Sequence, residues 1–111
     1  WAKLIPALNS GEIDVIMSGM SVTDERKQQV DFTESYLEIG QMAIIRMKDI
    51  GSLSLPGAMA RPGRPIGVEP GTTGEAYAKE HTAAIVKYFD NPAQAFEALR
   101  KGDINFYIHD K

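Results

Sequence analysis

Three residues of the sequence carry the charges and hydrogen-bond donors that a free α-amino acid needs. Arg26 follows a turn-forming segment, and its planar guanidinium can give a carboxylate two parallel, charge-assisted hydrogen bonds. Thr72 lies at a glycine-flanked helix start, where backbone N–H groups and the helix dipole favour an anion. Asp110 directly follows an apolar run, so its carboxylate can accept hydrogen bonds from an ammonium group at a strand end. Together the three residues predict a site for an amino-acid zwitterion.

Each of these residues also has an ordinary structural interpretation. Arg26 fits a solvated position on a helix surface, and Thr72 fits a common helix N-cap. Trp1 and Tyr36 either stack on a ligand or belong to the core. The binding hypothesis therefore depends on the combination of complementary charges rather than on any single side chain.

The sequence contains none of the common enzyme motifs. It has no nucleophile elbow, no phosphate-binding glycine loop followed by Lys-Ser/Thr, and no His-Glu-x-x-His pair. His81 and His109 are far apart in the chain, with no motif joining them. His109 beside Asp110 fits either an acid–base pair or a capping carboxylate next to an incidental imidazole. We therefore predict a binding protein with no catalytic residue, no metal and no cofactor.

The composition is that of a globular protein, with 43% hydrophobic and 24% charged residues in 111. The net charge of −3 argues against a nucleic-acid partner, because phosphate binding needs a basic surface. Without cysteine there is no disulfide framework or thiolate metal site. The chain starts at Trp1 rather than Met and stops at Lys111 after a strand-like run, so we expect an excerpt of a longer protein.

Apolar spacing predicts the elements of the first half of the chain. A helix over residues 1–8 ends before Gly11, and a short apolar run at 13–17 predicts a buried strand. Thr23 is expected to cap a polar helix over 24–29. Residues 41–47 predict another strand, and the stretch 50–64, rich in proline and glycine, predicts a loop or linker.

The second half alternates between strand and helix. We expect strands at 65–69, 84–89 and 104–108, and helices from the glycine-flanked turn at 71–74 to about 83 and from Pro92 to Gly102. Asp90 or Asn91 would cap the second helix. Such alternation predicts a parallel α/β sheet, and ligands of such sheets lie beyond the C-terminal ends of the strands.

Two segments of the chain resemble each other. Residues 7–14 and 98–105 both read Ala-Leu-x-x-Gly, an acidic residue, Ile and Asp or Asn. Each predicts a helix end, a glycine stop and a buried strand. Either one helix-to-strand turn recurs, or the chain carries two lobes of similar build.

Several motifs make the sequence similar to a known family. The segments 4–8, 11–14, 18–26 and 30–36, followed by 67–68, 71–73, 98–99 and 108–110, resemble the bacterial extracellular solute-binding proteins of family three, the polar amino-acid class. This resemblance implies a periplasmic-binding-protein-like α/β fold, a two-lobed clamp of which the chain holds the middle. Residues 1–45 would belong to lobe 1, residues 46–64 to the hinge, and residues 65–111 to lobe 2.

The resemblance also implies a ligand-binding set in each lobe. In lobe 1, Arg26 would clamp the ligand carboxylate, Ser21 would add a hydroxyl and a backbone contact, the Gly19 carbonyl would face the amine, and Trp1 would be a pocket aromatic.

In lobe 2, Thr72 would donate its backbone N–H to the carboxylate, and Asp110 would bind the amine. Glu69 departs from members that carry a lysine near the side-chain pocket, and Asn105 replaces a more typical aspartate.

The function implied by the resemblance is binding of an amino acid or a similar small polar solute, outside the cell or in the periplasm, for delivery to the membrane permease of an ABC transporter. One alternative is the sensing domain of a membrane receptor or kinase, or the regulatory domain of a cell-wall enzyme. Another is a dehydratase on the same fold, with Glu69 or His109 as its acid–base residue.

The excerpt itself is expected to associate when it is studied alone. Residues 42–46 and the strand 104–108 would have open edges or uncovered faces, and such surfaces drive association. We therefore expect a dimer, a larger assembly or a domain swap, with the stretch 50–64 as the hinge of the exchange.

Overall fold

The computed structural model describes residues 1–55 and 57–111. The chain divides into two compact units, Trp1–Ile39 and Gly40–Lys111. The predicted lobe 1 segment, residues 1–45, therefore includes a strand that joins the sheet of the second unit.

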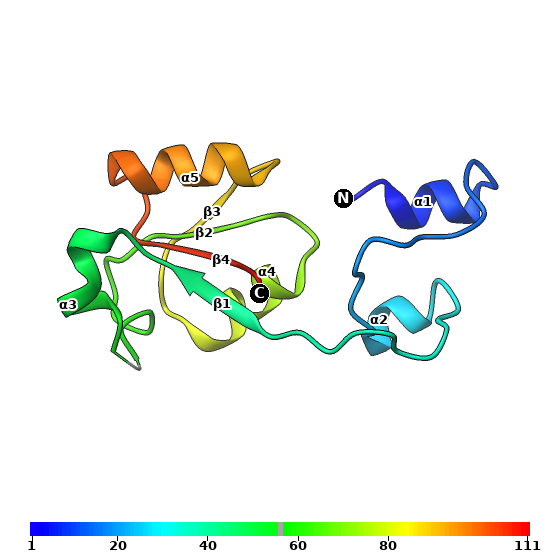
Figure 1. The fold of residues 1–111 in the computed structure, drawn as a ribbon, viewed down its shortest axis with the longest axis horizontal. Coiled ribbons are helices and arrows are strands. Elements are labelled where there is room, and N and C mark those ends of the chain that lie inside the picture. The colour runs from blue at the N-terminus through cyan, green and yellow to red at the C-terminus, as the bar shows by residue number, and fades with distance from the viewer. Residues whose placement is uncertain (56) are drawn as a thin grey trace. The chain divides into compact units, whose positions relative to one another are not determined.

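The first unit contains two short helices joined by irregular backbone, drawn from blue to cyan in Figure 1. Helix α1 spans Leu4–Asn9 and helix α2 spans Asp24–Lys27. Helix α2 begins where expected because the Thr23 hydroxyl accepts a hydrogen bond from the Arg26 N–H at 3.2 Å, which satisfies one of the free donors of the first turn.

The buried strand predicted at 13–17 is wrong. Residues 1–39 contain no strand, and Val15 and Met17 are 70% and 83% exposed. A strand needs a hydrogen-bonded neighbour, and every strand pair of the described residues lies in the second unit. Apolar residues alone therefore do not make this segment a strand.

The second unit is built on a four-stranded mixed sheet with the strand order β1-β4-β2-β3. Strand β2 is parallel to β3 and to β4, as the alternation of strands and helices predicted, whereas β1 runs antiparallel to β4. The strands and helices of this sheet are β1 (Gln41–Ile44), β2 (Ile66–Val68), α4 (Thr73–His81), β3 (Val86–Tyr88), α5 (Pro92–Lys101) and β4 (Phe106–Asp110).

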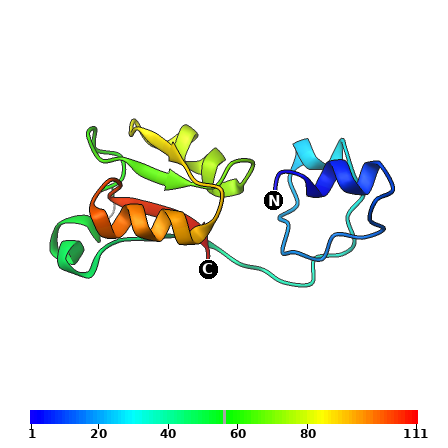
Figure 2. The ribbon, with the colours of Figure 1, turned by 90° about the horizontal axis from the view of Figure 1, so that it is seen from above.

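Helices α4 and α5 cover opposite faces of this sheet (Figures 1 and 2). Strand β4 alternates between them: Phe106 and Ile108 join the apolar cluster that holds Ala78 of α4, and Tyr107 joins the cluster that holds Leu99 of α5. The open edge expected at 104–108 is therefore wrong, because β4 lies inside the sheet with a neighbour on each side.

Helix α5 has the boundaries that its sequence predicts. The Asn91 side chain accepts a hydrogen bond from the Gln94 N–H at 3.1 Å, and Pro92 follows in the first turn. Gly102 ends the helix with φ of 91°, a left-handed conformation that glycine adopts without a Cβ clash.

The stretch predicted as the hinge, residues 46–64, is partly helical and packs within the second unit. It contains the 3₁₀ helix η1 (Met47–Asp49) and the one-turn helix α3 (Ile50–Leu53), while residue 56 lies outside the described residues. Leu53 and Ala58 are buried in the core. Before η1, the Nη1 atom of Arg46 donates to the carbonyls of Leu99 at 2.8 Å and Ile104 at 2.9 Å, so it ties this stretch to the end of α5.

Candidate functional site

Arg26 is the buried charged residue at the centre of the first unit's candidate site. Its side chain belongs to α2, and the residue is only 9% exposed. One guanidinium nitrogen, Nη1, donates to the Ser21 carbonyl at 2.8 Å, and the guanidinium carbon lies 5.6 Å from the centre of the Trp1 ring. This distance is within the range of a cation–π interaction. The structure therefore brings Arg26, Ser21 and Trp1 together.

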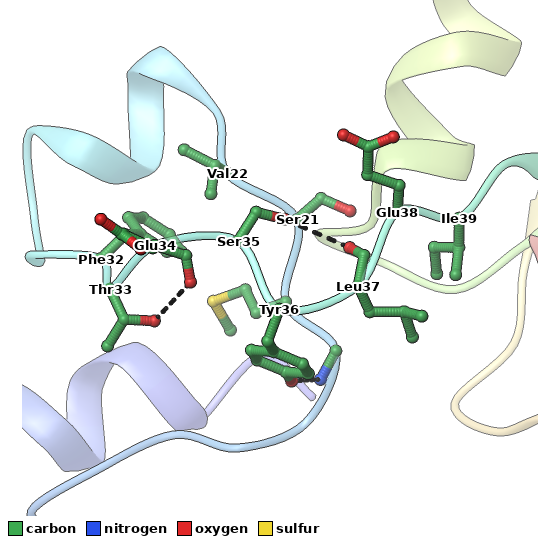
Figure 3. Close-up of a pocket in the computed structure, with 12 residues that line it drawn as sticks. Ser21, Val22, Phe32, Thr33, Glu34, Ser35, Tyr36, Leu37, Glu38 and Ile39 are labelled. Atoms are coloured by element: carbon green, nitrogen blue, oxygen red, sulfur yellow. Dashed lines mark hydrogen bonds between the residues drawn. The ribbon is translucent and has the colours of Figure 1, made fainter.

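Gly19 lies next to Tyr36 in the first unit. The Gly19 N–H donates to the Tyr36 hydroxyl at 3.2 Å, which joins two loop segments of the first unit (Figure 3). These loops line a cavity of about 460 Å³. Its lining residues are Gly19, Met20, Ser21, Val22, Phe32, Thr33, Glu34, Ser35, Tyr36, Leu37, Glu38 and Ile39. Gly19, Ser21 and Tyr36 are thus residues considered from the sequence that line this cavity.

Thr72 begins helix α4 in the second unit and is half-buried. Its hydroxyl accepts from the Glu75 N–H at 3.2 Å and donates to the Glu69 carbonyl at 2.7 Å. The hydroxyl is therefore engaged in capping, and the backbone N–H of Thr72 lies at the helix start, where N–H groups favour an anion.

Asp110 is the last residue of β4 and faces Gln41 across the sheet. The Gln41 amide nitrogen donates to Oδ1 of Asp110 and to the Thr73 hydroxyl, the latter at 2.9 Å. One amide group therefore links the strand end that carries Asp110 to the first turn of α4, which begins at Thr72. The structure brings Thr72 and Asp110 to the same edge of the sheet, beyond the C-terminal end of a parallel strand, where ligands of open α/β sheets bind.

A second group of titratable side chains lies beside this edge. The buried Tyr107 hydroxyl donates to Oε1 of Glu69 at 2.7 Å, and Nε2 of His109 is 3.4 Å from the same oxygen. Burial, followed by the adjacent Glu69 carboxylate, raises the pKa of Tyr107 well above its ordinary value. The phenol therefore stays protonated and remains a hydrogen-bond donor to Glu69.

Charge pairing also shapes the start of α4. Glu75 accepts from the Gly71 N–H at 2.6 Å and from Lys79 at 2.5 Å. The Lys79 ammonium is the main reason that the pKa of Glu75 lies below its usual value. This pairing neutralises a carboxylate one turn from Thr72.

Sequence reasoning missed Gln41 and Tyr107. Gln41 lies in a strand with no motif around it, and its closeness to Asp110 follows only from the antiparallel pairing of β1 with β4. Tyr107 sits in an apolar run, so the sequence marks it as core, which it also is. The hydrogen bond from the Tyr107 hydroxyl to Glu69 becomes visible only when the structure places Glu69 at the end of the neighbouring strand.

The described residues were searched for metal-ligand groups and for membrane-spanning helices. Within residues 1–55 and 57–111, no group of three or more His, Cys, Asp or Glu side chains is arranged to hold a metal ion. Among the helices of these same residues, none is both long and apolar enough to cross a bilayer.

The second unit is an α/β sheet with a capped helix start and an acidic strand end at one edge, and the first unit holds a buried arginine. The chain belongs to the bacterial extracellular solute-binding proteins, family 3, whose sequence profile matches residues 1–107. This confirms the family resemblance of the sequence.

Known relatives support the same family. The chain is 31% identical over 114 residues to a probable histidine-binding protein of Neisseria gonorrhoeae, covering 99% of this chain and 41% of that one. It is 44% identical over 89 residues to an L-arginine-binding protein of Pseudomonas aeruginosa, covering 77% of this chain and 33% of that one. Other relatives are glutamine- and cystine-binding proteins.

The fold also matches solved structures. The crystal structure of AncCDT-1, an ancestral amino acid-binding protein described as a precursor of cyclohexadienyl dehydratase, has a TM-score of 0.94 at 34% identity, covering 99% of this chain and 49% of that chain. The predicted fold class, the α/β fold of two-lobed periplasmic binding proteins, is confirmed. The chain spans about half the length of the proteins it matches, or less.

Proposed function

We propose that the chain is part of a protein that binds a free amino acid outside the cell or in the periplasm. The observation that carries this proposal is the placement of Asp110 beside the helix start at Thr72, because the Gln41 amide donates both to Asp110 and to Thr73, the residue after Thr72. A helix start favours a carboxylate, and an acidic strand end favours an ammonium group, so one edge of the sheet offers complementary groups for an α-amino acid. The relatives differ in their amino acid, but all of them bind one that carries these two groups.

The first unit contributes a second binding group for the ligand carboxylate. Arg26 is buried, held by the Ser21 carbonyl and positioned over Trp1, so its orientation is fixed before a ligand arrives. A guanidinium gives a carboxylate two parallel hydrogen bonds, which lysine cannot reproduce. In this proposal Arg26, Ser21, Gly19 and Trp1 are the ligand contacts of the first unit, with Arg26 for a carboxylate. Thr72, for a carboxylate, and Asp110, for an ammonium group, are those of the second unit.

Uptake by an ABC transporter is the proposed setting, with the membrane permease as the protein partner. The family is one of extracellular solute-binding proteins, which supports delivery of a captured solute to a membrane component. A sensor domain that uses the same fold is the alternative setting. Pull-down of the permease by the full-length protein, in the presence of its ligand, supports transport, whereas recovery of a receptor or kinase instead points to sensing.

We propose binding without chemical change of the ligand. The similarity to a precursor of cyclohexadienyl dehydratase keeps a dehydratase as the rival, with Glu69 or His109 as its acid–base residue. Mass spectrometry of the ligand after incubation with the full-length protein separates the two. Loss of one water from the ligand identifies a dehydratase, and recovery of the intact ligand supports binding.

Isothermal titration calorimetry of the full-length protein with the common amino acids and a sugar tests the proposed function. Binding of at least one amino acid, lost in Asp110→Asn, is the expected result, because the amide lacks the charge that pairs with an ammonium. Asp103→Asn is the matched control, an exposed residue before the opposite end of β4. No heat with any amino acid, or binding of the sugar alone, would show that the proposal is wrong.

A further inference from the structure

Three side chains at the ends of β2 and β4 form a cluster that the proposed ligand contacts do not use. Oε1 of Glu69, just past the end of β2, accepts from the Tyr107 hydroxyl at 2.7 Å and lies 3.4 Å from Nε2 of His109. Tyr107 and His109 are two positions apart in β4, so their rings share one face of the sheet, with centres 5.5 Å apart. The cluster therefore joins two neighbouring parallel strands within the second unit.

Both ring nitrogens of His109 face an oxygen that accepts. Nδ1 is 3.0 Å from the Asp110 carbonyl oxygen, and Nε2 is 3.4 Å from Oε1 of Glu69. A neutral imidazole carries one N–H and can serve one of these oxygens, whereas the charged imidazolium carries two. The carbonyl is the shorter contact, so it takes the proton of the neutral ring and leaves the lone pair of Nε2 facing a carboxylate. Protonation of Nε2 turns this repulsive contact into an ion pair.

The other titratable groups of β4 are engaged elsewhere or do not change charge. Burial, followed by the Glu69 carboxylate, raises the pKa of Tyr107, so the phenol keeps its proton and donates to Glu69 throughout the range in which histidine titrates, roughly pH 5–8. The Asp110 carboxylate accepts from the Gln41 amide. His109 is therefore the group of this strand whose charge changes beside Glu69.

The elements packed against this face place uncharged or paired side chains around the cluster. Strand β1 sets Met42 opposite His109, and α5 packs Phe96 edge-on against Tyr107. Asp90, at the start of α5, is exposed. The charged side chains at the other end of α5 pair with one another; they are Glu97, Arg100 and Lys101.

We propose that His109 and Glu69 form a proton-controlled clasp between the ends of β4 and β2. The charged imidazole donates to the Asp110 carbonyl and pairs with Glu69, so it ties the two strand ends together. As the pH rises through the range of histidine, the second proton is lost and the clasp opens. Its stabilisation is thus present at the acid end and lost toward alkaline pH, the reverse of the Glu75–Lys79 pair.

The clasp acts on the edge of the sheet that carries the proposed ligand contacts of the second unit. Asp110 and the turn before Thr72 both leave from the joined strand ends, so the rigidity of this edge depends on pH. All of the residues involved belong to one unit. The clasp therefore needs no ligand, and its test is separate from that of the proposed function.

Nitrogen-15 NMR of the histidine rings in the ligand-free, full-length protein tests the clasp without any substitution. The His109 ring is identified by its contact with the Tyr107 ring. At pH 8 it should be neutral with its proton on Nδ1, and at pH 5.5 both nitrogens should carry protons. A neutral ring protonated on Nε2 would overturn the proposal, because it donates to Glu69 without a change of charge. A ring that is still neutral at pH 5.5 would overturn it as well.

A double-mutant cycle measures how strongly the clasp favours folding. Urea unfolding is followed for the full-length parent, His109→Gln, Glu69→Gln and the double variant, at pH 5.5 and at pH 8. Glutamine at position 69 keeps an acceptor for the Tyr107 hydroxyl. The coupling should correspond to at least about fivefold in the unfolding equilibrium constant at pH 5.5, the scale of a partly exposed ion pair, and to less than about twofold at pH 8.

The matched control is the same cycle at a second histidine and glutamate. His81, at the end of α4, lies 4.0 Å from Glu80, and both side chains are more than half exposed. Their coupling should stay below about twofold at both pH values, because solvent screens the pair. Equal coupling of His109 and Glu69 at the two pH values, or none at pH 5.5, would show that the clasp does not exist.

Discussion

Gln41 and Asp110 face each other across the β1–β4 pair, although 69 positions separate them in the chain. The Gln41 amide nitrogen donates to the Asp110 carboxylate and to the Thr73 hydroxyl, so a strand end and a helix start share one donor. Because Gln41 holds one Asp110 oxygen, it fixes the orientation of the carboxylate that we propose binds an ammonium group. Gln41 is in this sense a positioning residue for the proposed site.

Gln41→Met should therefore weaken ligand binding without unfolding the protein. Methionine has a similar length but cannot donate to Asp110 or Thr73, and Gln41 is exposed, so the free energy of unfolding should change by less than about 1 kcal/mol. Calorimetry should show a several-fold loss of amino-acid affinity, and a thermal melt should show a nearly unchanged Tm. Parental affinity in this variant would contradict the positioning role.

Arg26→Lys should weaken amino-acid binding by about 1.5–3 kcal/mol in the full-length protein. Lysine keeps the charge but loses the planar fork that fits a carboxylate and that holds the Ser21 carbonyl and the Trp1 ring in the parent. Calorimetry measures the loss. Arg100→Lys, at an exposed position of α5, is the control and should bind as the parent does. Equal affinities of the two variants would show that Arg26 is not a ligand contact.

Acid should destabilise the second unit through Glu75. Its pKa is lowered in the folded state, mainly by Lys79, so the pairing stabilises the fold above the ordinary carboxyl pKa of 4.5. The contribution is lost as the pH falls through the lowered folded value, because the unfolded state then binds the proton first. Chemical unfolding between pH 6 and 3 should show a flatter pH dependence for Glu75→Gln than for the parent. The same pH dependence in both proteins would mean that the Glu75–Lys79 pair contributes nothing to stability.

Gly102→Ala should cost about 1 kcal/mol of stability, because alanine is strained at the left-handed φ of 91° that ends α5. Gly51→Ala should instead raise the free energy of unfolding. Gly51 lies in α3 with ordinary φ and open space around a new Cβ, so alanine favours the helix there by up to about 1 kcal/mol. Urea unfolding of both variants measures the difference. Equal effects at the two positions would contradict the role of backbone conformation.

Local signals in the sequence predicted much of the fold. The Thr23 cap, the Pro92 start and the Gly102 stop fix α2 and α5 through contacts within a few residues, so spacing was enough to find them. The strand expected at 13–17 failed because pairing is not a local property. Residues 98–105, which resemble residues 7–14, lead into β4, and that strand has neighbours on both sides.

The candidate site was predictable only in part, for the same reason. Arg26, Thr72 and Asp110 stand out by residue type and by their place at helix starts and strand ends. Gln41, which contacts Asp110, and Tyr107, which contacts Glu69, become visible only once the strand order and register are known. The helical turns within 46–64 were also missed, since proline and glycine there mark turns without showing that Leu53 is buried.

The 111-residue chain, studied alone, should associate in solution. The edge expected at 104–108 is covered, but β1 remains an edge strand of the sheet, and the first unit exposes apolar side chains such as Val15, Met17 and Leu37. Open edges and exposed apolar surface both favour contact between copies. Light scattering should report a mass above that of one chain, and replacing Val15 and Met17 with Ser should shift it toward the monomer. A parental chain that scatters as a monomer and melts sharply would show that these surfaces are tolerated without a partner.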